Sequence, residues 1–240
     1  MTTVATAAID SQKKKISIIL VHGAFVDASG WQAVYTFLSQ DGYEVLVVQN
    51  STITLEGDVE ATRRAIARAS HPVILVGHSY GGAVITQAGD DPRVSCLVYL
   101  AAFVPEVGES VFLLATAPTP GEEGAPLLPP SDGFLIVDPE KFPAAFAADM
   151  DLATTRFMAA AQLPWGLGAV QASLTTAAWK QKPAHYLLAQ QDRMVPPSAQ
   201  RAMAQRAQAK LQEIESSHAL MLSHPREVAD FIVKAAGELL

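Results

Sequence analysis

Ser79 stands between Gly77 and Gly81 in the stretch VILVGHSYGGAVI, where an apolar run typical of a buried strand changes to a helical pattern. A sharp turn from strand to helix strains the serine backbone, and side chains two residues before and after it would collide. The spacing therefore predicts a nucleophile elbow. The competing interpretation is a glycine-rich turn with an incidental serine. A phosphate-binding loop is excluded because no Gly-Lys-Ser or Gly-Lys-Thr follows.

A serine hydroxyl at such a turn needs a neighbouring base, and histidine is the usual one. The histidines that follow Ser79 in the sequence are His185, His218 and His224. His218 directly follows an alternating stretch at 210–216 that predicts a strand, so it would lie at the carboxyl edge of a sheet, where sites of open α/β proteins lie. His185 falls inside a predicted strand and His224 precedes a proline, positions that favour structural roles. We expect His218 to be the base.

An acid that orients the histidine is the third part of this chemistry. Asp192 ends the predicted strand at 184–192 and precedes the His218 strand, so the two loops should be neighbours. The competing interpretation is that Asp192 is only a turn residue ahead of Pro196. Glu106 and Glu109, which follow the predicted strand at 94–101, are the rival acids. We expect Asp192 to fill the role.

Two backbone N–H groups are candidates for stabilising an oxyanion. The first predicted strand ends in LVHGAF, and the tight bend after it points to the N–H of Ala24. The second is the N–H of Tyr80, at the start of the helix after the elbow. We expect His22 to brace its loop and His78 to support the elbow, and neither to act as a second base.

The elements that must hold these residues alternate between strand and helix. Apolar or alternating stretches predict strands at 16–23, 43–49, 72–77, 94–101, 184–192 and 210–216. Helical spacing predicts helices at 29–41 with Ser29 as the cap, and at 58–69, 80–88, 196–209 and 225–240. This order is typical of an α/β fold with a mostly parallel sheet of about six strands and helices on both faces.

The alternation stops between residues 104 and 183, which we interpret as a helical cap inserted into a core of 16–103 and 184–240. Helices are expected at 138–161 and 168–180, joined to the core by a proline-rich loop. A substrate pocket under such a cap would use apolar side chains, although ordinary core packing explains each of them as well. The candidates are Phe25, Phe103, Phe157, Met158, Leu163 and Trp165.

Composition narrows the class of protein. The chain is 50% hydrophobic with a net charge of −7, and its basic residues form no cluster larger than Lys13 to Lys15, so we expect no nucleic-acid partner. The single cysteine, Cys96, allows no intrachain disulfide. Residues 1–15 read as a flexible N-terminus without a signal peptide, and no apolar run is long enough to span a membrane. A cytoplasmic protein, monomer or homodimer, without metal or cofactor is expected.

Four stretches together give the sequence a family resemblance: LVHGAFVDASGWQAV, VILVGHSYGGAVI, LVYLAAFVPE and SSHALML. They resemble the α/β-hydrolase superfamily, and most closely its branch of plant methylesterases, hydroxynitrile lyases and bacterial relatives. The resemblance covers about 16–106 and 184–236. It implies Ser79 as nucleophile, Asp192 as acid, His218 as base, and Ala24 and Tyr80 as oxyanion donors.

The sequence departs from the lyases of that branch at two positions. They carry a lysine after the histidine and a threonine after the first-strand histidine, where this chain has Ala219 and Gly23. We therefore expect a serine hydrolase that cleaves a carboxylic ester of a small, largely apolar substrate through an acyl-enzyme. The alternatives are a lyase that uses the three residues as a base alone, and a small-molecule receptor with a hydrolase fold.

Overall fold

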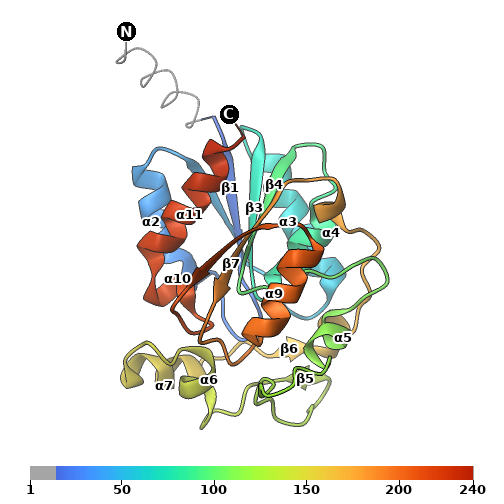
Figure 1. The fold of residues 1–240 in the computed structure, drawn as a ribbon, viewed down its shortest axis with the longest axis vertical. Helices are drawn as coiled ribbons and strands as arrows, with labels where there is room; N and C mark the ends of the chain where they lie inside the picture. The colour runs from blue at the N-terminus through green and yellow to red at the C-terminus, as the bar shows by residue number, and fades with distance from the viewer. Residues whose placement is uncertain (1–14, 240) are drawn as a thin grey trace.

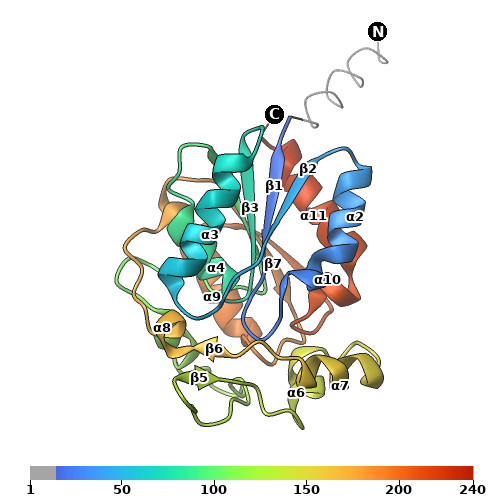
Figure 2. The same ribbon diagram turned by 180° about the vertical axis from the view of Figure 1, so that it is seen from behind.

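The computed structural model describes residues 15–239 of the chain (Figure 1). The predicted flexible N-terminus at 1–15 lies, apart from Lys15, outside the described residues. The described part forms a sheet flanked by helices, with a group of short elements at one end (Figures 1 and 2).

The central sheet has six strands in the order β2-β1-β3-β4-β7-β8, and every pairing in it is parallel. The predicted α/β fold, with its six strands and helices on both faces, is confirmed. The strands are β1 (Ser17–Val21), β2 (Glu44–Val48), β3 (Val73–His78), β4 (Val94–Leu100), β7 (Ala184–Ala189) and β8 (Lys210–Ile214). The register pairs Val21 with Gly77, so the bend after β1 lies beside the turn after β3.

Both faces of the sheet are covered because the central strands are apolar on both sides. In β1, Ile18 and Leu20 pack in one hydrophobic cluster, whereas Ile19 and Val21 pack in another on the opposite face. One face carries α2 (Gln32–Gln40), α10 (Leu220–Ser223) and α11 (Pro225–Gly237), and the other carries α3 (Leu55–Arg68), α4 (Gly81–Ala88) and α9 (Pro197–Arg206) (Figures 1 and 2).

Two helices begin differently from the sequence prediction. Asp27, not Ser29, caps the first helical segment: its carboxylate accepts the Ser29 N–H at 2.8 Å, and a 3₁₀ turn, η1 (Ala28–Trp31), precedes α2. Helix α3 begins at Leu55, three residues earlier than predicted, because the Thr54 hydroxyl accepts the Gly57 N–H.

The segment 104–183 is built of shorter elements than predicted, and most of them gather at the end of the molecule where the strands finish, whereas the last one lies beside α4 (Figure 1). They are α5 (Val111–Ala115), β5 (Phe134–Leu135), α6 (Phe142–Phe146), α7 (Leu152–Ala160), β6 (Trp165–Gly166), α8 (Leu167–Val170) and η2 (Ala178–Lys180). We call this segment the cap. The antiparallel pair of β5 and β6 was not predicted, because two-residue strands leave no periodic signal.

Both predicted cap helices are wrong in extent, for physical reasons that the structure shows. The helix expected at 138–161 is interrupted between α6 and α7, where Asp149 binds serines of the core and Asp151 caps α7. The helix expected at 168–180 ends at Val170. The chain beyond it bonds to the core instead: the Gln87 side chain accepts the N–H groups of Thr175 and Thr176.

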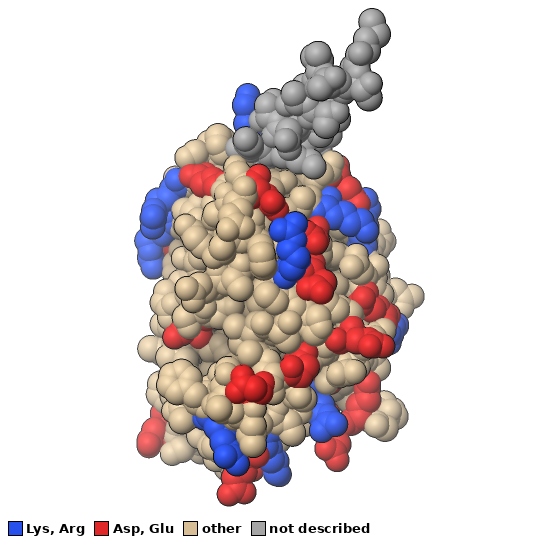
Figure 3. All heavy atoms as spheres, turned by 90° about the vertical axis from the view of Figure 1, so that its left-hand side faces the viewer, with Lys and Arg blue, Asp and Glu red and all other residues tan. Residues whose placement is uncertain are grey.

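The surface in Figure 3 shows Lys and Arg interspersed with Asp and Glu on that face of the molecule, without separation of the two signs. Within residues 15–239, no helix combines the length and the apolar character that crossing a membrane would require.

Candidate active site

The turn at Ser79 has the strained backbone that the glycine spacing predicts. Ser79 has a φ of +54°, and its backbone is fixed by bonds from its N–H to Leu100 O (3.2 Å) and from the Phe103 N–H to its carbonyl (3.1 Å). A Cβ at Gly77 would lie 2.6 Å from the Gly81 oxygen, and one at Gly82 would lie 2.3 Å from the Phe103 oxygen. Glycine is therefore required where α4 packs against the strand ends.

His218 and Asp192 form a buried pair at the ends of β8 and β7. Nδ1 of His218 lies 2.7 Å from Oδ2 of Asp192, and the residues are 1% and 4% exposed. The other carboxylate oxygen accepts the N–H groups of Met194 (2.7 Å) and Val195 (2.9 Å). Because an ionised carboxylate only accepts hydrogen bonds, Nδ1 carries the proton and Nε2 keeps a lone pair. That Nε2 is buried and has no partner among the described residues.

Gln200 on α9 completes the surroundings of Asp192, and sequence reasoning missed it. Its amide donates to Asp192 Oδ2 (2.8 Å) and to the Val195 carbonyl (2.7 Å), and its oxygen accepts the Ala189 N–H (3.2 Å). The sequence signal was a glutamine on the inward side of an otherwise apolar helix face. With four donors around it, Asp192 is held as a charged acceptor in one orientation.

His78 joins the elbow to the His218 loop. Its Nε2 lies 2.9 Å from the His218 carbonyl oxygen, and the two imidazole rings are 4.6 Å apart between centroids. Burial holds the pKa of His78 well below its usual value, and the nearby His218 adds to the effect. A neutral His78 donates from Nε2 to that carbonyl and so holds the His218 loop against the residue that precedes Ser79.

The remaining titratable candidates lie in other interactions. Glu106 pairs with Lys180 at 2.6 Å and Glu109 with Arg206 at 2.8 Å, and Asp192 alone of the three acids contacts His218. His185 lies 3.4 Å from Glu238 inside β7, and His224 bonds to the hydroxyl of the preceding serine. His22 accepts the Asn50 N–H at 2.8 Å and thereby braces the loop after β1.

The two predicted oxyanion donors face the same region. Ala24 and Tyr80 are both buried, and neither backbone N–H has an acceptor among the described residues. The bend that carries Ala24 packs against the elbow, since a Cβ at Gly23 would lie 2.7 Å from Cβ of Ser79. Phe25, with a φ of +67°, turns the chain away after the bend. Two unpaired amides beside a serine can hold a developing negative charge on a substrate oxygen.

Asp58 binds the side chain of Tyr80, and the sequence did not indicate this contact. The Tyr80 hydroxyl donates to Asp58 Oδ2 at 2.8 Å, while Oδ1 accepts the N–H groups of Ser51 (2.8 Å) and Thr52 (3.1 Å). Burial and the Asp58 carboxylate together raise the pKa of Tyr80 well above its usual value, so the phenol remains a donor. Asp58 lies in the first turn of α3, where an acid usually faces solvent and interacts with the helix dipole. For that reason the sequence did not indicate its bond to Tyr80.

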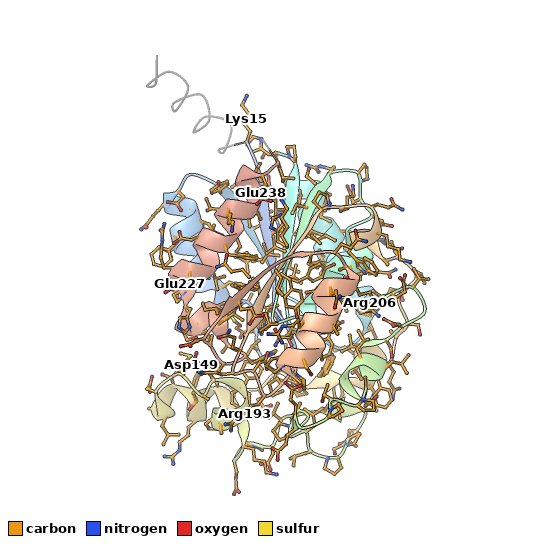
Figure 4. All side chains as sticks on the ribbon, viewed as in Figure 1. Lys15, Asp149, Arg193, Arg206, Glu227 and Glu238 are labelled. Atoms are coloured by element: carbon orange, nitrogen blue, oxygen red, sulfur yellow. The ribbon has the colours of Figure 1, made fainter. Side chains whose placement is uncertain are left out.

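The cap segment around Asp149, which Figure 4 labels, holds the His218 loop by hydrogen bonds to both chain neighbours of His218. Asp149 accepts the N–H of Ser217 at 3.0 Å and the hydroxyls of Ser217 and Ser216. The Phe146 carbonyl accepts the N–H of Ala219 at 3.0 Å, and the Phe146 ring lies edge-on to His218 at 4.9 Å. Burial opposes ionisation of Asp149, but the serine donors outweigh it and lower its pKa. Both neighbours of His218 in the chain are thus tied to the cap.

The predicted pocket residues separate into three groups. Phe25 and Trp165 are buried with ring centroids 5.7 Å apart, and Phe103 is buried beside a cavity of about 220 Å³. Met158 and Leu163 are partly buried in the cap. Phe157 is 72% exposed, because α7 turns Thr155 and Ala159 inward instead, and its place in a pocket stays a prediction.

No group of three or more His, Cys, Asp or Glu side chains within residues 15–239 is arranged to hold a metal ion.

Comparison with known proteins agrees with the fold and extends over most of the chain. The model of the alpha/beta hydrolase family matches residues 18–231. A carbendazim hydrolyzing esterase from Nocardioides sp. is 36% identical over 123 residues, which are 45% of this chain and 51% of the esterase. A pyrethroid hydrolase from Sphingobium faniae superposes with a TM-score of 0.78 at 24% identity, covering 92% of this chain and 97% of its own. A methylesterase from Arabidopsis superposes with a TM-score of 0.74 at 22% identity, covering 93% of this chain and 99% of the methylesterase.

The packing at the elbow predicts a large effect for one added methyl group. Gly82→Ala places a Cβ against the Phe103 carbonyl and should lower the free energy of unfolding by about 1–3 kcal/mol. Gly237→Ala, at the end of α11 with no atom within 4 Å, is the control and should be neutral or slightly stabilising. Urea denaturation of both variants measures the difference, and equal stabilities would contradict the close approach.

The buried histidines predict a dependence of stability on pH. Burial lowers the folded-state pKa of His22, His78 and His185, so below about pH 6.5 the unfolded chain binds protons that the folded chain does not. Stability should therefore fall between pH 7 and pH 5.5, by up to about 1.4 kcal/mol per pH unit for each histidine. Denaturation at several pH values tests this, and His78→Gln should reduce the slope by about one proton. A flat profile would show that these rings titrate alike in both states.

Proposed function

Because this chain belongs to the alpha/beta hydrolase family, we propose that it is a serine carboxylesterase that works through an acyl-enzyme. The observation that carries the proposal is the buried His218–Asp192 pair with a free Nε2, next to the strained turn at Ser79. Burial keeps water from competing for the proton that Nε2 would accept, and the fixed carboxylate stabilises the imidazolium once it forms.

Acylation begins when Nε2 of His218 takes the proton from the Ser79 hydroxyl as its oxygen attacks the ester carbonyl. The carbonyl oxygen gains negative charge and accepts hydrogen bonds from the N–H groups of Ala24 and Tyr80. Collapse of this tetrahedral intermediate breaks the bond to the alcohol, which leaves with the proton from His218. Ser79 is left as an ester of the substrate acid.

Deacylation repeats these steps with water in place of the serine. His218 takes a proton from the water, whose oxygen attacks the acyl carbonyl, and the same two amides hold the oxyanion. The proton then returns to the Ser79 oxygen as the acid is released. Asp192 stays ionised throughout and keeps the His218 ring in one tautomer.

The relatives support ester chemistry at this site. The protein named as a carbendazim hydrolyzing esterase is the most informative of them, because its identity with this chain reaches 36% over the matched region. Two features of the site disfavour a hydroxynitrile-lyase-like reaction. Position 219 carries alanine, which is fully buried, and position 23 has no room for a side chain against Ser79.

The first prediction from this mechanism concerns the nucleophile. Ser79→Ala should lower kcat for p-nitrophenyl esters by several orders of magnitude, on the order of 10⁶ in a well-studied serine hydrolase. A panel from acetate to octanoate measures the loss. A serine-directed phosphonate should add its mass to the unmodified chain and not to the variant.

Each alternative function has its own outcome in this experiment. A receptor would bind the esters without turnover and would resist the phosphonate. A lyase would turn over a cyanohydrin without any acyl-enzyme, so that no acylated Ser79 could be trapped. Equal hydrolysis by both forms of the protein would remove Ser79 from the mechanism.

The second prediction separates Asp192 from its rivals. Asp192→Asn leaves the shape but removes the acceptor for Nδ1–H, and the equivalent change in a serine protease lowers kcat about 10⁴-fold. Glu106→Gln is the matched control, because Glu106 pairs with the exposed Lys180 and should leave kcat nearly unchanged. If the two substitutions have the same effect on ester hydrolysis, the orienting acid is not Asp192.

A further inference from the structure

His218, the proposed base, lies on a segment without regular secondary structure. Residues 215–219 connect β8 to α10 and belong to neither a strand nor a helix, so no repeating ladder of backbone hydrogen bonds fixes them. The hydrogen bond from Nδ1 to Asp192 orients the imidazole ring, but it leaves the backbone of this segment to be held by other contacts. Nε2 can take a proton from Ser79 only within hydrogen-bond reach. The contacts that hold the segment therefore decide whether the base works.

Hydrogen bonds reach the backbone around His218 from two sides. From the core, Nε2 of His78 donates to the His218 carbonyl at 2.9 Å. From the cap, the Phe146 carbonyl accepts the N–H of the residue after His218 at 3.0 Å. Oδ2 of Asp149, also from the cap, accepts the N–H of the residue before it at 3.0 Å. Of the two cap contacts, that of Asp149 is made by a side chain and can be removed by a substitution.

The Asp149 carboxylate binds this segment with both of its oxygens. Oδ2 also accepts the hydroxyl of Ser216 at 2.9 Å, and Oδ1 accepts the hydroxyl of Ser217. Both serines are fully buried, and the Asp149 side chain is 19% exposed although the residue lies at the surface. Oδ2 lies 3.7 Å from Nδ1 of His224, which is too far for a hydrogen bond. Hydrogen bonds to an ionised carboxylate are roughly twice as strong as those between neutral groups, so Asp149 holds the segment more strongly than a neutral side chain would.

The side chain of Asp149 does not stabilise the cap itself. Among residues 15–239, its hydrogen bonds go to Ser216 and Ser217 in the core and not to another cap residue. Asp151, two positions later, does the opposite: its exposed carboxylate accepts the N–H (2.9 Å) and the hydroxyl (2.6 Å) of Thr154 and caps α7. One acid therefore stabilises a cap helix, whereas the other binds the segment that carries the base.

We propose that Asp149 is a positioning residue: by holding the segment 215–219, it keeps Nε2 of His218 within reach of the nucleophile. The proposal rests on the proposed esterase function and extends it, because it gives the cap a part in proton transfer that is separate from any contact with the substrate. A misplacement of about 1 Å at a reacting group can lower the rate roughly 100-fold. Removal of the Asp149 carboxylate should therefore act on kcat.

The test compares alanine substitutions of the two neighbouring acids. With p-nitrophenyl acetate, Asp149→Ala should lower kcat about 10- to 100-fold and leave KM within about twofold, because the carboxylate binds the base segment and not the substrate. Asp149→Asn keeps one accepting oxygen and should lose less. Asp151→Ala is the matched control: it removes the bonds to Thr154 and should leave kcat within about twofold.

The kinetic constants can contradict the proposal in three ways. An unchanged kcat in Asp149→Ala would overturn it. A rise in KM at constant kcat would also overturn it, because that change indicates lost substrate binding. An equal loss of kcat in Asp151→Ala would show a general loosening of the cap, and the specific role of Asp149 would be refuted.

A second variant tests the same contact from the core side. Ser217→Ala removes one hydroxyl donor and keeps the backbone N–H, so it should lower kcat by a smaller factor than Asp149→Ala. In the double variant the loss should be smaller than the product of the two single losses, because residues in contact are not independent; independent losses would overturn the proposal. If circular dichroism shows that Asp149→Ala does not fold, Ser217→Ala and Asp149→Asn decide. Losses of kcat at constant KM in both support the proposal, and an unchanged kcat in either overturns it.

A spectroscopic measurement separates this proposal from the proposed function. The Nδ1 proton of His218, bonded to a buried carboxylate, should give a proton resonance far downfield, which His218→Gln removes and thereby assigns. Asp149→Ala should shift or broaden this resonance, and Asp151→Ala should leave it unchanged. If the unmodified protein hydrolyses no ester, the proposed function fails and the resonance alone decides. A response confined to Asp149→Ala supports the positioning role, and a resonance that Asp149→Ala leaves unchanged overturns it.

Discussion

The left-handed backbone of Ser79 is the constraint on which the rest of the site depends. It persists only because the sheet and α4 leave the chain no other path: Gly77, Gly81 and Gly82 each lie against backbone atoms that exclude a side chain. The same close packing aligns the ends of β1, β3 and β4 at one level. Close packing therefore fixes the relative positions of three segments: the bend with Ala24, the turn with Ser79 and the chain at Phe103.

Around this rigid turn, the polar side chains form a network with few unpaired members. Asp149 ties the His218 loop to the cap, and the two buried carboxylates, Asp192 and Asp58, each accept four hydrogen bonds. Buried charges of this kind are tolerated only when they are fully bonded, and a bonded network has little freedom to rearrange. Among the described residues, His218 Nε2 is unpaired, as are Nδ1 of His78 and Oδ1 of Asn50, and it is the atom from which we derive the chemistry.

The sequence was sufficient to predict the sheet and the sharp turn at Ser79, because both are encoded locally. Continuous apolar strands and the glycine spacing around Ser79 are patterns within a dozen residues. The partners of those residues are not encoded in this way. Asp58, Asp149 and Gln200 resemble ordinary surface residues until folding places them against Tyr80, Ser217 and Asp192. The cap helices were overestimated for the same reason, since tertiary bonds to Asp149 and Gln87 end them where local spacing would continue.

The order of the strands has a consequence for synthesis of the protein. The four strands β2, β1, β3 and β4 are consecutive in the chain and form one side of the sheet, whereas β7 and β8 are added beyond the cap. Since chains emerge from the ribosome N-terminus first, the turn with Ser79 can fold well before Asp192 and His218 exist. A nascent chain thus carries its serine as an ordinary alcohol. In the proposed mechanism, the serine becomes reactive only when residues 184–240 have docked onto β4, so the topology would protect the growing protein from acylation.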